Sequence, residues 1–556
     1  MKKLLNDPQH LVRELLEGTV DLSPGLALLD GENVVLRSDL PVPADRRVAV
    51  LSGGGSGHEP AHAGYVGAGM LTAAIAGDVF TSPSTDAVLA AILAASGPAG
   101  ALLIIKNYTG DRLNFGLAAE LARQHGIPVE VVVVADDVAL RDLVPRGRRR
   151  GIAGTVLIHK LAGAAAELGM ALPEVAAIAR RAADQLASMG VGLGACIVPA
   201  AGVPGFALGE DEIEFGLGIH GEKGVERTTI RSADAIATAL LDAILDDMQL
   251  PAGARVALLV NGLGGTAPME LAIMARAALA QVRARGLVAE RAWAGNFMTA
   301  MEMPGCSLTL LPLDAERDAL LDQPSSAPAW PGPGRVSAQR QLVKGVAAAT
   351  PPAGTPGPLT ADLKAAMQAI ATALEGAEER LTALDAQAGD GDLGASMARG
   401  AAAIRALSED SYATPARLLT DLGNALRRAI AGSSGPFYAT ALLRAAGGLD
   451  GKAQPGPADW VQALQAAIAA ITELGGAKAG DRTMIDALLP ALAAGQEGGG
   501  LDAIAQAADE GAQATSAMFP ALGRASYLGQ RALGVPDGGA VAVSIWLRAL
   551  ADSGRF

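Results

Sequence analysis

The sequence is poor in aromatic residues, in cysteine and in positive charge. Phe, Trp and Tyr make up 3% of its 556 residues, and 58 acidic side chains outnumber 44 basic ones, which gives a net charge of −14. Binding to nucleic acid or to an anionic membrane surface needs an excess of positive charge, and stacking on bases needs aromatic rings. We therefore expect no nucleic-acid partner and no membrane partner.

Two further absences concern the cellular compartment. Cys196 and Cys306 are the only cysteines, and two cysteines cannot build a disulfide framework. No run of 18 apolar residues occurs, and the first twelve residues turn polar at Asn6, so we expect neither a membrane span nor a signal peptide. These features predict a cytoplasmic protein with reduced thiols.

The first 330 residues carry the pattern of an α/β fold. Half of the whole chain is hydrophobic and 18% is charged, which is a globular composition. Short aliphatic runs alternate with helical patterns, as in folds that place helices on a sheet. These runs are 47–51, 101–105, 129–134, 195–198, 255–260 and 307–311. A weak break near residue 185 predicts two lobes, about 1–185 and 186–322.

The chain changes character after a segment rich in proline and glycine. Residues 323–359 cannot sustain a helix or a central strand, so we interpret them as an extended linker. Beyond them, apolar residues from Leu363 to Leu384 recur at spacings of four and three, which predicts one amphipathic helix of about six turns. Alanine-rich helical segments continue to Leu550, and residues 360–556 are predicted to be all-α.

Candidate catalytic residues of the first domain follow predicted strands. A glycine-rich segment, Gly53 to Gly57, follows a strand that ends at Leu51, and it ends on His58. Lys106 and Asp111 follow the next strand, and His220 lies in an apolar segment flanked by glycine. The residues alone leave an alternative open in each case: a tight turn for the glycines, surface charges for Lys106 and Asp111, and a core histidine for His220. The segment is neither a Walker A motif nor a dinucleotide fingerprint.

Three aspartates of the second domain have the pattern of a metal site. Asp385, Asp390 and Asp392 lie where Gly389 and Gly391 break a predicted helix. Crowded carboxylates repel one another unless a cation neutralises them, and oxygen ligands without histidine or cysteine favour Mg²⁺ with phosphate oxygens. A solvated acidic loop is the alternative. Glycine-rich turns at 431–436, 479–484 and 523–540 can present backbone N–H groups to a polyphosphate, so we predict a nucleotide site here.

Five motifs in order resemble those of the single-chain, ATP-dependent dihydroxyacetone (glycerone) kinases. They are Gly-Gly-Gly-Ser-Gly-His-Glu-Pro, Lys-Asn-Tyr-Thr-Gly-Asp, Gly-Ile-His-Gly-Glu, Gly-Asp-Gly-Asp and Gly-Arg-Ala-Ser-Tyr-Leu-Gly. The resemblance covers nearly the whole chain. It implies an α/β substrate domain of two lobes and an all-α helical barrel that binds ATP, together with phosphorylation of dihydroxyacetone and glyceraldehyde.

The resemblance also implies roles for single residues. It implies that the substrate carbonyl binds covalently to His220 as a hemiaminal, and that Asp111 is the general base, assisted by His58. The triose pocket would contain Gly55, Ser56, Gly57 and Lys106, and two Mg²⁺ ions would be held by Asp385, Asp390 and Asp392. Nucleotide contacts are expected from Leu393, Gly394, Ala395, Ser396, Ser433, Ser434, Gly480, Leu489, Arg524, Asp537, Gly538 and Gly539.

Three other functions stay open at this point. One is transfer from a phosphoenolpyruvate-dependent carrier protein, which normally has the two domains on separate chains. Another is a lyase that cyclises the ribityl part of FAD to cyclic FMN at the same metal site. A binding protein that captures trioses and regulates a partner would leave the three aspartates without a role. For the kinase, the resemblance implies a homodimer with sites shared between chains.

Overall fold

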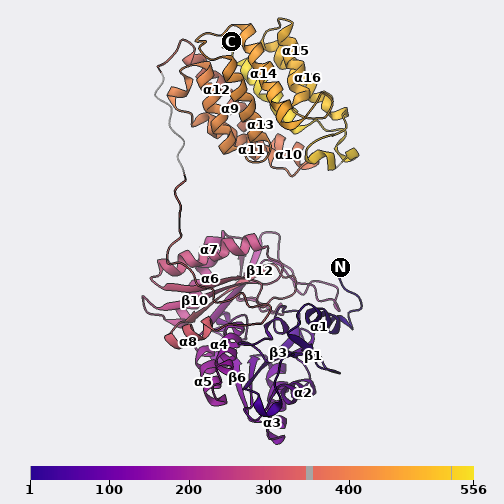
Figure 1. Cartoon of the computed structure of the whole chain (residues 1–556), viewed down its shortest axis with the longest axis vertical. Coiled ribbons are helices and arrows are strands. Elements are labelled where there is room, and N and C mark those ends of the chain that lie inside the picture. The colour runs from indigo at the N-terminus through magenta and orange to yellow at the C-terminus, as the bar shows by residue number, and fades with distance from the viewer. Residues whose placement is uncertain (1, 346–354, 528, 556) are drawn as a thin grey trace. The chain divides into compact units, whose positions relative to one another are not determined.

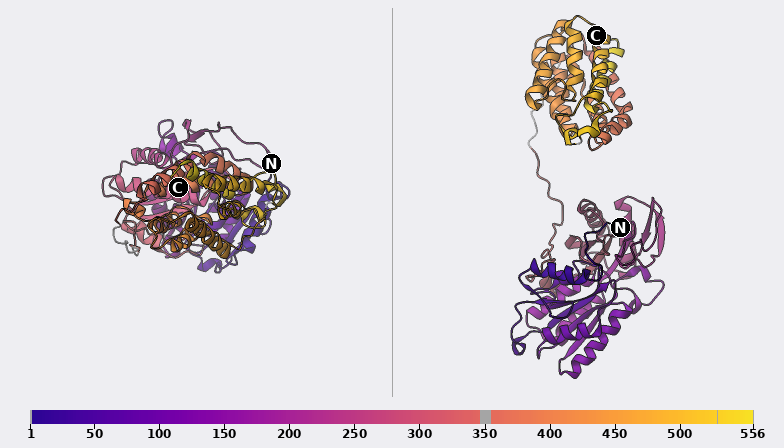
Figure 2. Two further views of the ribbon diagram at one scale, coloured as in Figure 1. Left: turned by 90° about the horizontal axis from the view of Figure 1, so that it is seen from above. Right: turned by 90° about the vertical axis from the view of Figure 1, so that its right-hand side faces the viewer.

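The computed structural model describes residues 2–345, 355–527 and 529–555, and it contains two compact units, Met1–Lys344 and Gly345–Phe556. In the described ranges every strand belongs to the first unit, and the second is built from helices (Figures 1 and 2). This is the predicted combination of an α/β domain with an all-α domain. Among the described residues, no helix is both long enough and apolar enough to cross a bilayer.

The first lobe is a six-stranded sheet covered on both faces. Its strands lie in the order β1 (Leu26–Leu28), β2 (Val34–Arg37), β4 (Ala73–Val79), β3 (Ala49–Ser56), β5 (Ala101–Lys106) and β6 (Val129–Val134). The last four strands in this order run parallel. Helices α2 (Thr85–Ala95) and α3 (Thr109–Gln124) cover one face, while α4 (Thr155–Glu167) and α5 (Leu172–Ala183) cover the other. Because both faces are covered, every residue of β5 is buried, which explains its continuous apolar run.

The second lobe is a mixed sheet with one parallel pair. Its order is β11 (Val288–Gly295), β10 (Arg255–Gly262), β12 (Gly305–Pro312), β7 (Ala187–Gly192), β8 (Glu212–Phe215) and β9 (Glu226–Thr229). Only β10 and β11 are parallel in this sheet. Helices α6 (Ala233–Met248) and α7 (Pro268–Ala284) pack on one face. The apolar core on the other face is continuous with that of the first lobe, so the two lobes share one core.

Three local predictions are wrong. The glycines from Gly53 to Gly55 do not form a loop but lie inside β3, because all three pair with β4 and Gly53 also pairs with β5. Residues 195–198 are not a strand; β7 lies earlier, in a stretch whose two glycines hide its apolar pattern. The predicted six-turn helix is two helices, α9 (Thr360–Gly376) and α10 (Glu378–Ala388), with Ala377 between them outside ideal helical geometry.

The start of the predicted linker packs on the first unit. Ala327 and Trp330 are buried, and the ring centroid of Trp330 lies 5.1 Å from that of Trp293 in β11. Arg335 forms a β-bridge with Arg291 of the same strand. Apolar contact therefore fixes this part of a segment whose composition favours an extended chain. The limits 323 and 359 stay a prediction, since part of the segment lies outside the described residues.

The second unit is a closed ring of helices. The helices follow one another around the ring in the order α9, α11 (Leu393–Arg405), α12 (Pro415–Ala429), α13 (Ser434–Gly448), α14 (Pro457–Gly475), α15 (Ile485–Gln496), α16 (Leu501–Ala514) and α17 (Gly538–Asp552). Each helix packs on the next, and α17 packs back on α9. The core is rich in alanine, from Ala371 to Ala549, which lets helices approach closely. This is the helical barrel that the resemblance implies.

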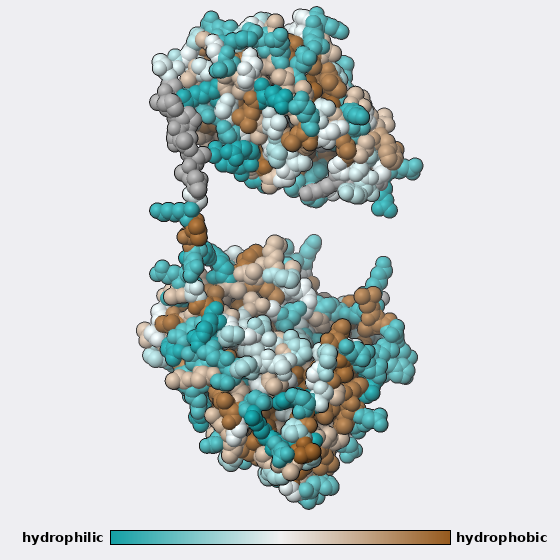
Figure 3. All heavy atoms as spheres, viewed as in Figure 1, coloured by the Kyte–Doolittle hydropathy of each residue, from teal (hydrophilic) through white to brown (hydrophobic). Residues whose placement is uncertain are grey.

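The surfaces of both units mix hydrophilic and hydrophobic residues on the face shown in Figure 3. Exposed large apolar residues include Leu113 and Leu117 of α3 in the first unit and Leu443 and Leu474 in the second. Apolar atoms make up more than half of an ordinary protein surface, so such scattered residues need no functional explanation.

Candidate active site

Two histidines from different lobes meet in the first unit. His58 follows β3 of the first sheet, and His220 follows β8 of the second. Their Nε2 atoms lie 3.1 Å apart, and their ring centroids are 4.9 Å apart. The structure thus joins two motifs separated by 162 residues of sequence.

Each ring is fixed by an acceptor at its other nitrogen. Nδ1 of His58 lies 2.7 Å from the carbonyl oxygen of Thr299, and Nδ1 of His220 lies 2.9 Å from Oε1 of Glu222. Both Nδ1 atoms must carry a proton, because a carbonyl and an ionised carboxylate can only accept. A hydrogen bond between the two Nε2 atoms then needs one further proton between them.

Burial and nearby positive charge disfavour a second proton on the His58 ring. Burial lowers the pKa of His58 well below its usual value, and the nearby Lys106 and His220 lower it further. Burial alone would raise the pKa of Glu222, but the hydrogen bond from His220 and its charge outweigh burial and bring the pKa of Glu222 to about 2. Glu222 is therefore an anion in direct contact with the His220 ring.

Aromatic rings enclose the two histidines. Phe80 stacks on His58 with ring centroids 5.1 Å apart, and the rings of Tyr108 and His220 meet edge to face with centroids 4.6 Å apart. A Cβ at Gly57 would lie 2.8 Å from the ring of Phe80, so the glycine lets this ring approach the backbone. Gly55 lies in β3, and the hydroxyl of Ser56 donates to the carbonyl of Gly77 in β4 at 2.7 Å.

Lys106 and Asp111 converge near Gly54. Lys106 ends β5, and Asp111 lies in the first turn of α3. A Cβ at Gly54 would lie 3.1 Å from Nζ of Lys106 and 3.5 Å from Oδ2 of Asp111. Nζ of Lys106 and Oδ1 of Asp111 are buried and have no hydrogen-bond partner among the described residues. Since buried polar atoms are normally satisfied, this pair points to a polar ligand.

Burial shifts the pKa of both groups toward their neutral forms. It lowers the pKa of Lys106, against the attraction of Asp111, Glu222 and Glu59. It raises the pKa of Asp111, against Lys106 and a hydrogen bond from Ser82. A carboxylate with a raised pKa is a better proton acceptor than an exposed aspartate, so Asp111 can serve as a general base.

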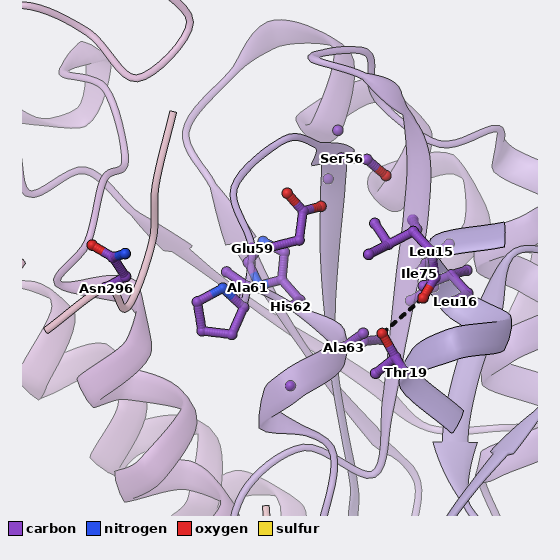
Figure 4. Close-up of a pocket in the computed structure, with 16 residues that line it drawn as sticks. Leu15, Leu16, Thr19, Ser56, Glu59, Ala61, His62, Ala63, Ile75 and Asn296 are labelled. Carbon is purple, nitrogen blue, oxygen red and sulfur yellow. Dashed lines mark hydrogen bonds between the residues drawn. The ribbon is translucent and has the colours of Figure 1, made fainter. Parts of the chain in front are cut away.

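A cavity of about 410 Å³ lies beside the glycine-rich strand (Figure 4). Helix α1 (Leu11–Asp21) contributes Leu15, Leu16 and Thr19 to its wall, and Glu59 and His62 face it from the loop after β3. Its described lining includes the backbone of Gly54 to Ser56 but neither histidine of the pair, nor Lys106 or Asp111. The cavity is thus a neighbour of the histidine pair and not the space between those four side chains.

The second unit brings the three aspartates together. Ligand oxygens of Asp385, Asp390 and Asp392 all lie within 4.8 Å of one another. Asp385 closes the turn, because its Oδ2 accepts from the backbone N–H of Leu393 at 3.2 Å, and Asp392 is the N-cap residue of α11. Three carboxylate oxygens at one helix end are a donor set that suits a hard divalent cation.

Most residues expected to contact a nucleotide lie at helix ends of the barrel. Leu393 to Ser396 begin α11, Ser433 and Ser434 begin α13, and Asp537 to Gly539 begin α17. The starts of α11 and α17 are neighbours, since a Cβ at Gly538 would lie 2.7 Å from Cδ2 of Leu393. The backbone N–H of Gly480 donates to Asp486 at 2.5 Å, and Leu489 lies in α15. Arg524 begins a short 3₁₀ helix, and its side chain lies outside the described part of the structure.

Comparison with known proteins decides the family. A profile described as the Dak1 domain matches residues 17–329, and one described as the DAK2 domain matches residues 387–552. The chain belongs to the dihydroxyacetone kinase family. This confirms the resemblance predicted from the five motifs.

Named relatives match this family member over nearly its full length. The triokinase/FMN cyclase of Homo sapiens is 44% identical over 576 residues, which cover 99% of each chain. The dihydroxyacetone kinase of Citrobacter freundii is 40% identical over 99% of this chain and 98% of its own. The crystal structure of the C. freundii kinase with AMP-PNP and Mg²⁺ matches with a TM-score of 0.65 at 37% identity, covering 99% of both chains.

Three contributors to the site were missed in the sequence. Thr299 orients His58, Glu222 orients His220, and Phe80 packs against both imidazoles. Glu222 had a signal, because it ends the Gly-Ile-His-Gly-Glu motif. Thr299 had no such signal, because its backbone carbonyl is the acceptor and every residue type carries one.

Proposed function

We propose that this chain is an ATP-dependent kinase that phosphorylates dihydroxyacetone and glyceraldehyde. The observation that carries the proposal is the paired imidazole contact of His58 and His220, at 3.1 Å, close to the unsatisfied Lys106 and Asp111. A triose offers a carbonyl group to an imidazole and hydroxyl groups to a charged pair. Phosphoryl transfer depends mainly on such positioning and on charge neutralisation.

The proposed binding step is a hemiaminal on His220. The proton between the rings moves from Nε2 of His220 to Nε2 of His58, and the freed lone pair attacks the substrate carbonyl carbon. As the C–N bond forms, the carbonyl π electrons move to oxygen, which takes the proton from His58. No other reactant is consumed. Glycerol has no carbonyl and cannot undergo this step, so the chemistry itself selects the substrate.

Asp111 is the proposed general base of phosphoryl transfer. It takes the proton of the substrate hydroxyl while that oxygen bonds to the γ-phosphorus of ATP and ADP leaves. Its raised pKa, caused by burial, supports this role. Lys106, buried beside it, would donate hydrogen bonds to substrate oxygens from its otherwise unpartnered Nζ.

The donor set in the second unit fits Mg²⁺. Asp385, Asp390 and Asp392 would hold two ions, because their clustered oxygens need positive charge between them. When bound, Mg²⁺ neutralises charge on the phosphates of ATP. The residues proposed to contact the nucleotide are those at the starts of α11, α13 and α17, with Gly480, Leu489 and Arg524. Backbone N–H groups at such helix starts suit phosphate oxygens.

The alternatives are less well supported. Both domains occur in one chain, which speaks against the carrier-dependent kinase. A lyase acting on FAD gives no role to His58, Lys106, Asp111 and His220.

A homodimer and a cytoplasmic location are also part of the proposal. Two buried free cysteines, Cys196 and Cys306, suit a reducing compartment.

The substitution Asp111→Asn tests the proposed base. We expect kcat to fall by about 10²- to 10⁴-fold, because the amide cannot accept the hydroxyl proton. The wild-type kcat should fall as the pH decreases through the raised pKa of Asp111, since only the ionised carboxylate is a base. A coupled assay of triose phosphate formation between pH 5 and 9 measures both. An unchanged kcat in the variant would refute the assignment.

The substitution Gly54→Ala tests where the triose binds. The added methyl group would lie 3.1 Å from Nζ and Cε of Lys106, on the side of the strand that faces Asp111. We expect the KM for dihydroxyacetone to rise about tenfold, as for moderate overpacking, while the KM for ATP stays unchanged. Gly116→Ala in α3, where a Cβ meets nothing within 4 Å, is the matched control. An unchanged triose KM in Gly54→Ala would show that the substrate binds elsewhere.

A further inference from the structure

We propose that Glu222 is a positioning residue that fixes the tautomer of His220. By holding the proton on Nδ1, its carboxylate keeps Nε2 available as the nucleophile that faces His58. The inference rests on the proposed covalent capture of the triose carbonyl, because only a nucleophilic role makes the tautomer matter.

The carboxylate contacts the histidine twice. Oε1 of Glu222 lies 2.9 Å from Nδ1 of His220, and Oε2 accepts the backbone N–H of the same residue at 3.0 Å. Two donors from one residue therefore meet two acceptors of one side chain. An ionised carboxylate satisfies both, whereas an amide offers one acceptor and one donor.

A tight turn holds Glu222 in this position. The backbone N–H of Gly218 donates to the carbonyl of Glu222 at 3.0 Å, and that of Gly221 donates to the carbonyl of Gly218 at 3.1 Å. A Cβ at Gly218 would lie 2.0 Å from Oε2 of Glu222. The carboxylate of Glu222 thus occupies space that a side chain at position 218 would fill, so the contact with His220 requires glycine there.

The other charged groups near His220 cannot replace Glu222. His58 meets the ring at Nε2, the opposite nitrogen, and Phe80 and Tyr108 meet it with aromatic rings. Asp111 and Lys106 face the pocket side near Gly54. Glu222 is the acidic residue found within hydrogen-bond distance of Nδ1 among the described residues.

The amide variant Glu222→Gln should reverse the tautomer. Its single carbonyl oxygen can accept the backbone N–H of His220 only if its NH₂ group faces Nδ1, which must then be an acceptor. The ring then holds its one proton on Nε2, and passing that proton to His58 would leave the His220 ring an anion, so the lone pair needed for attack on the carbonyl is not available. A histidine held in the wrong tautomer by an amide in place of a carboxylate loses several orders of magnitude of activity in serine proteases.

The test combines a spectrum with kinetics on the full-length protein. The chain has only six histidines, so ¹⁵N-histidine labelling gives a simple spectrum in which His220→Asn identifies the His220 signals. We expect a protonated Nδ1 in the wild type and an unprotonated Nδ1 in Glu222→Gln. We also expect kcat/KM for dihydroxyacetone to fall at least 10²-fold, with the KM for ATP unchanged. Glu210→Gln, at an exposed site of the same region, is the control.

A second pair of variants keeps the test valid if Glu222→Gln folds poorly. Glu222→Asp and Glu222→Asn have the same shortened side chain and differ in charge and acceptor number. We expect kcat/KM to be at least tenfold higher in Glu222→Asp than in Glu222→Asn. Equal values in this pair, or an unchanged His220 tautomer in Glu222→Gln, would overturn the inference. A wild type that forms no adduct with [2-¹³C]dihydroxyacetone would instead overturn the proposed function.

Discussion

The substitution His220→Ala is expected to lower kcat/KM for dihydroxyacetone by about 10³-fold or more. The variant loses the nucleophile that captures the carbonyl, and with it the orientation that makes the attacking hydroxyl effectively intramolecular. Binding of Mg-ATP should be unaffected, because the residues proposed for it belong to the other unit. Steady-state kinetics with each substrate varied in turn separates these two expectations.

The control for this experiment is His125→Ala. His125 is exposed at the end of α3, so its removal should change neither kcat nor KM. ¹³C NMR with [2-¹³C]dihydroxyacetone supplies a readout that does not depend on turnover, since a protein-bound tetrahedral carbon, distinct from that of the free hydrate, is seen only when the adduct forms. Full turnover by His220→Ala would show that covalent capture is not required.

The substitution Asp390→Ala is expected to lower kcat by at least about 10²-fold while leaving the triose adduct intact. Removing one carboxylate from a cluster whose oxygens lie within 4.8 Å weakens the site proposed for Mg²⁺. Loss of a single electrostatic partner of a transferring group has effects of this size. Electron paramagnetic resonance of Mn²⁺ in place of Mg²⁺ measures metal binding directly.

Asp450→Ala is the matched control for the metal site. Asp450 is exposed after α13, away from the three clustered aspartates in sequence, and its loss should leave Mn²⁺ affinity unchanged. Chelation of divalent metal should abolish turnover of the wild type, and added Mg²⁺ should restore it. Turnover that survives chelation would show that the three carboxylates do not serve a metal in the reaction.

The architecture could be predicted from the sequence because its signals are local. The continuous apolar run of β5 reflects burial on both faces of its sheet, and the helical periodicity after residue 360 reflects one apolar face per helix. Prediction failed where tertiary context overrides local preference. The glycines of β3 have the composition of a loop but pair with β4, and Trp330 anchors a segment whose composition is that of a linker.

The site could be predicted only in part, for a similar reason. Motifs identified His58, Lys106, Asp111 and His220. The packing of the two lobes brings His58 to His220, and the turn from β5 into α3 within the first lobe brings Lys106 to Asp111. The groups that orient the two histidines are the backbone carbonyl of Thr299 and the carboxylate of Glu222, which a tight turn holds in place. Such partners are defined by distance in three dimensions, which residue types do not encode.

Competition between dihydroxyacetone and glycerol tests whether His220 selects the substrate by capturing its carbonyl group. Purified protein is incubated with equal amounts of dihydroxyacetone and glycerol, with ATP and Mg²⁺, and the phosphorylated products are followed by ³¹P NMR. Because only a carbonyl can bond to Nε2 of His220, we expect dihydroxyacetone phosphate to accumulate and glycerol phosphate not to form. Phosphorylation of glycerol at a comparable rate would contradict selection of the substrate by covalent capture.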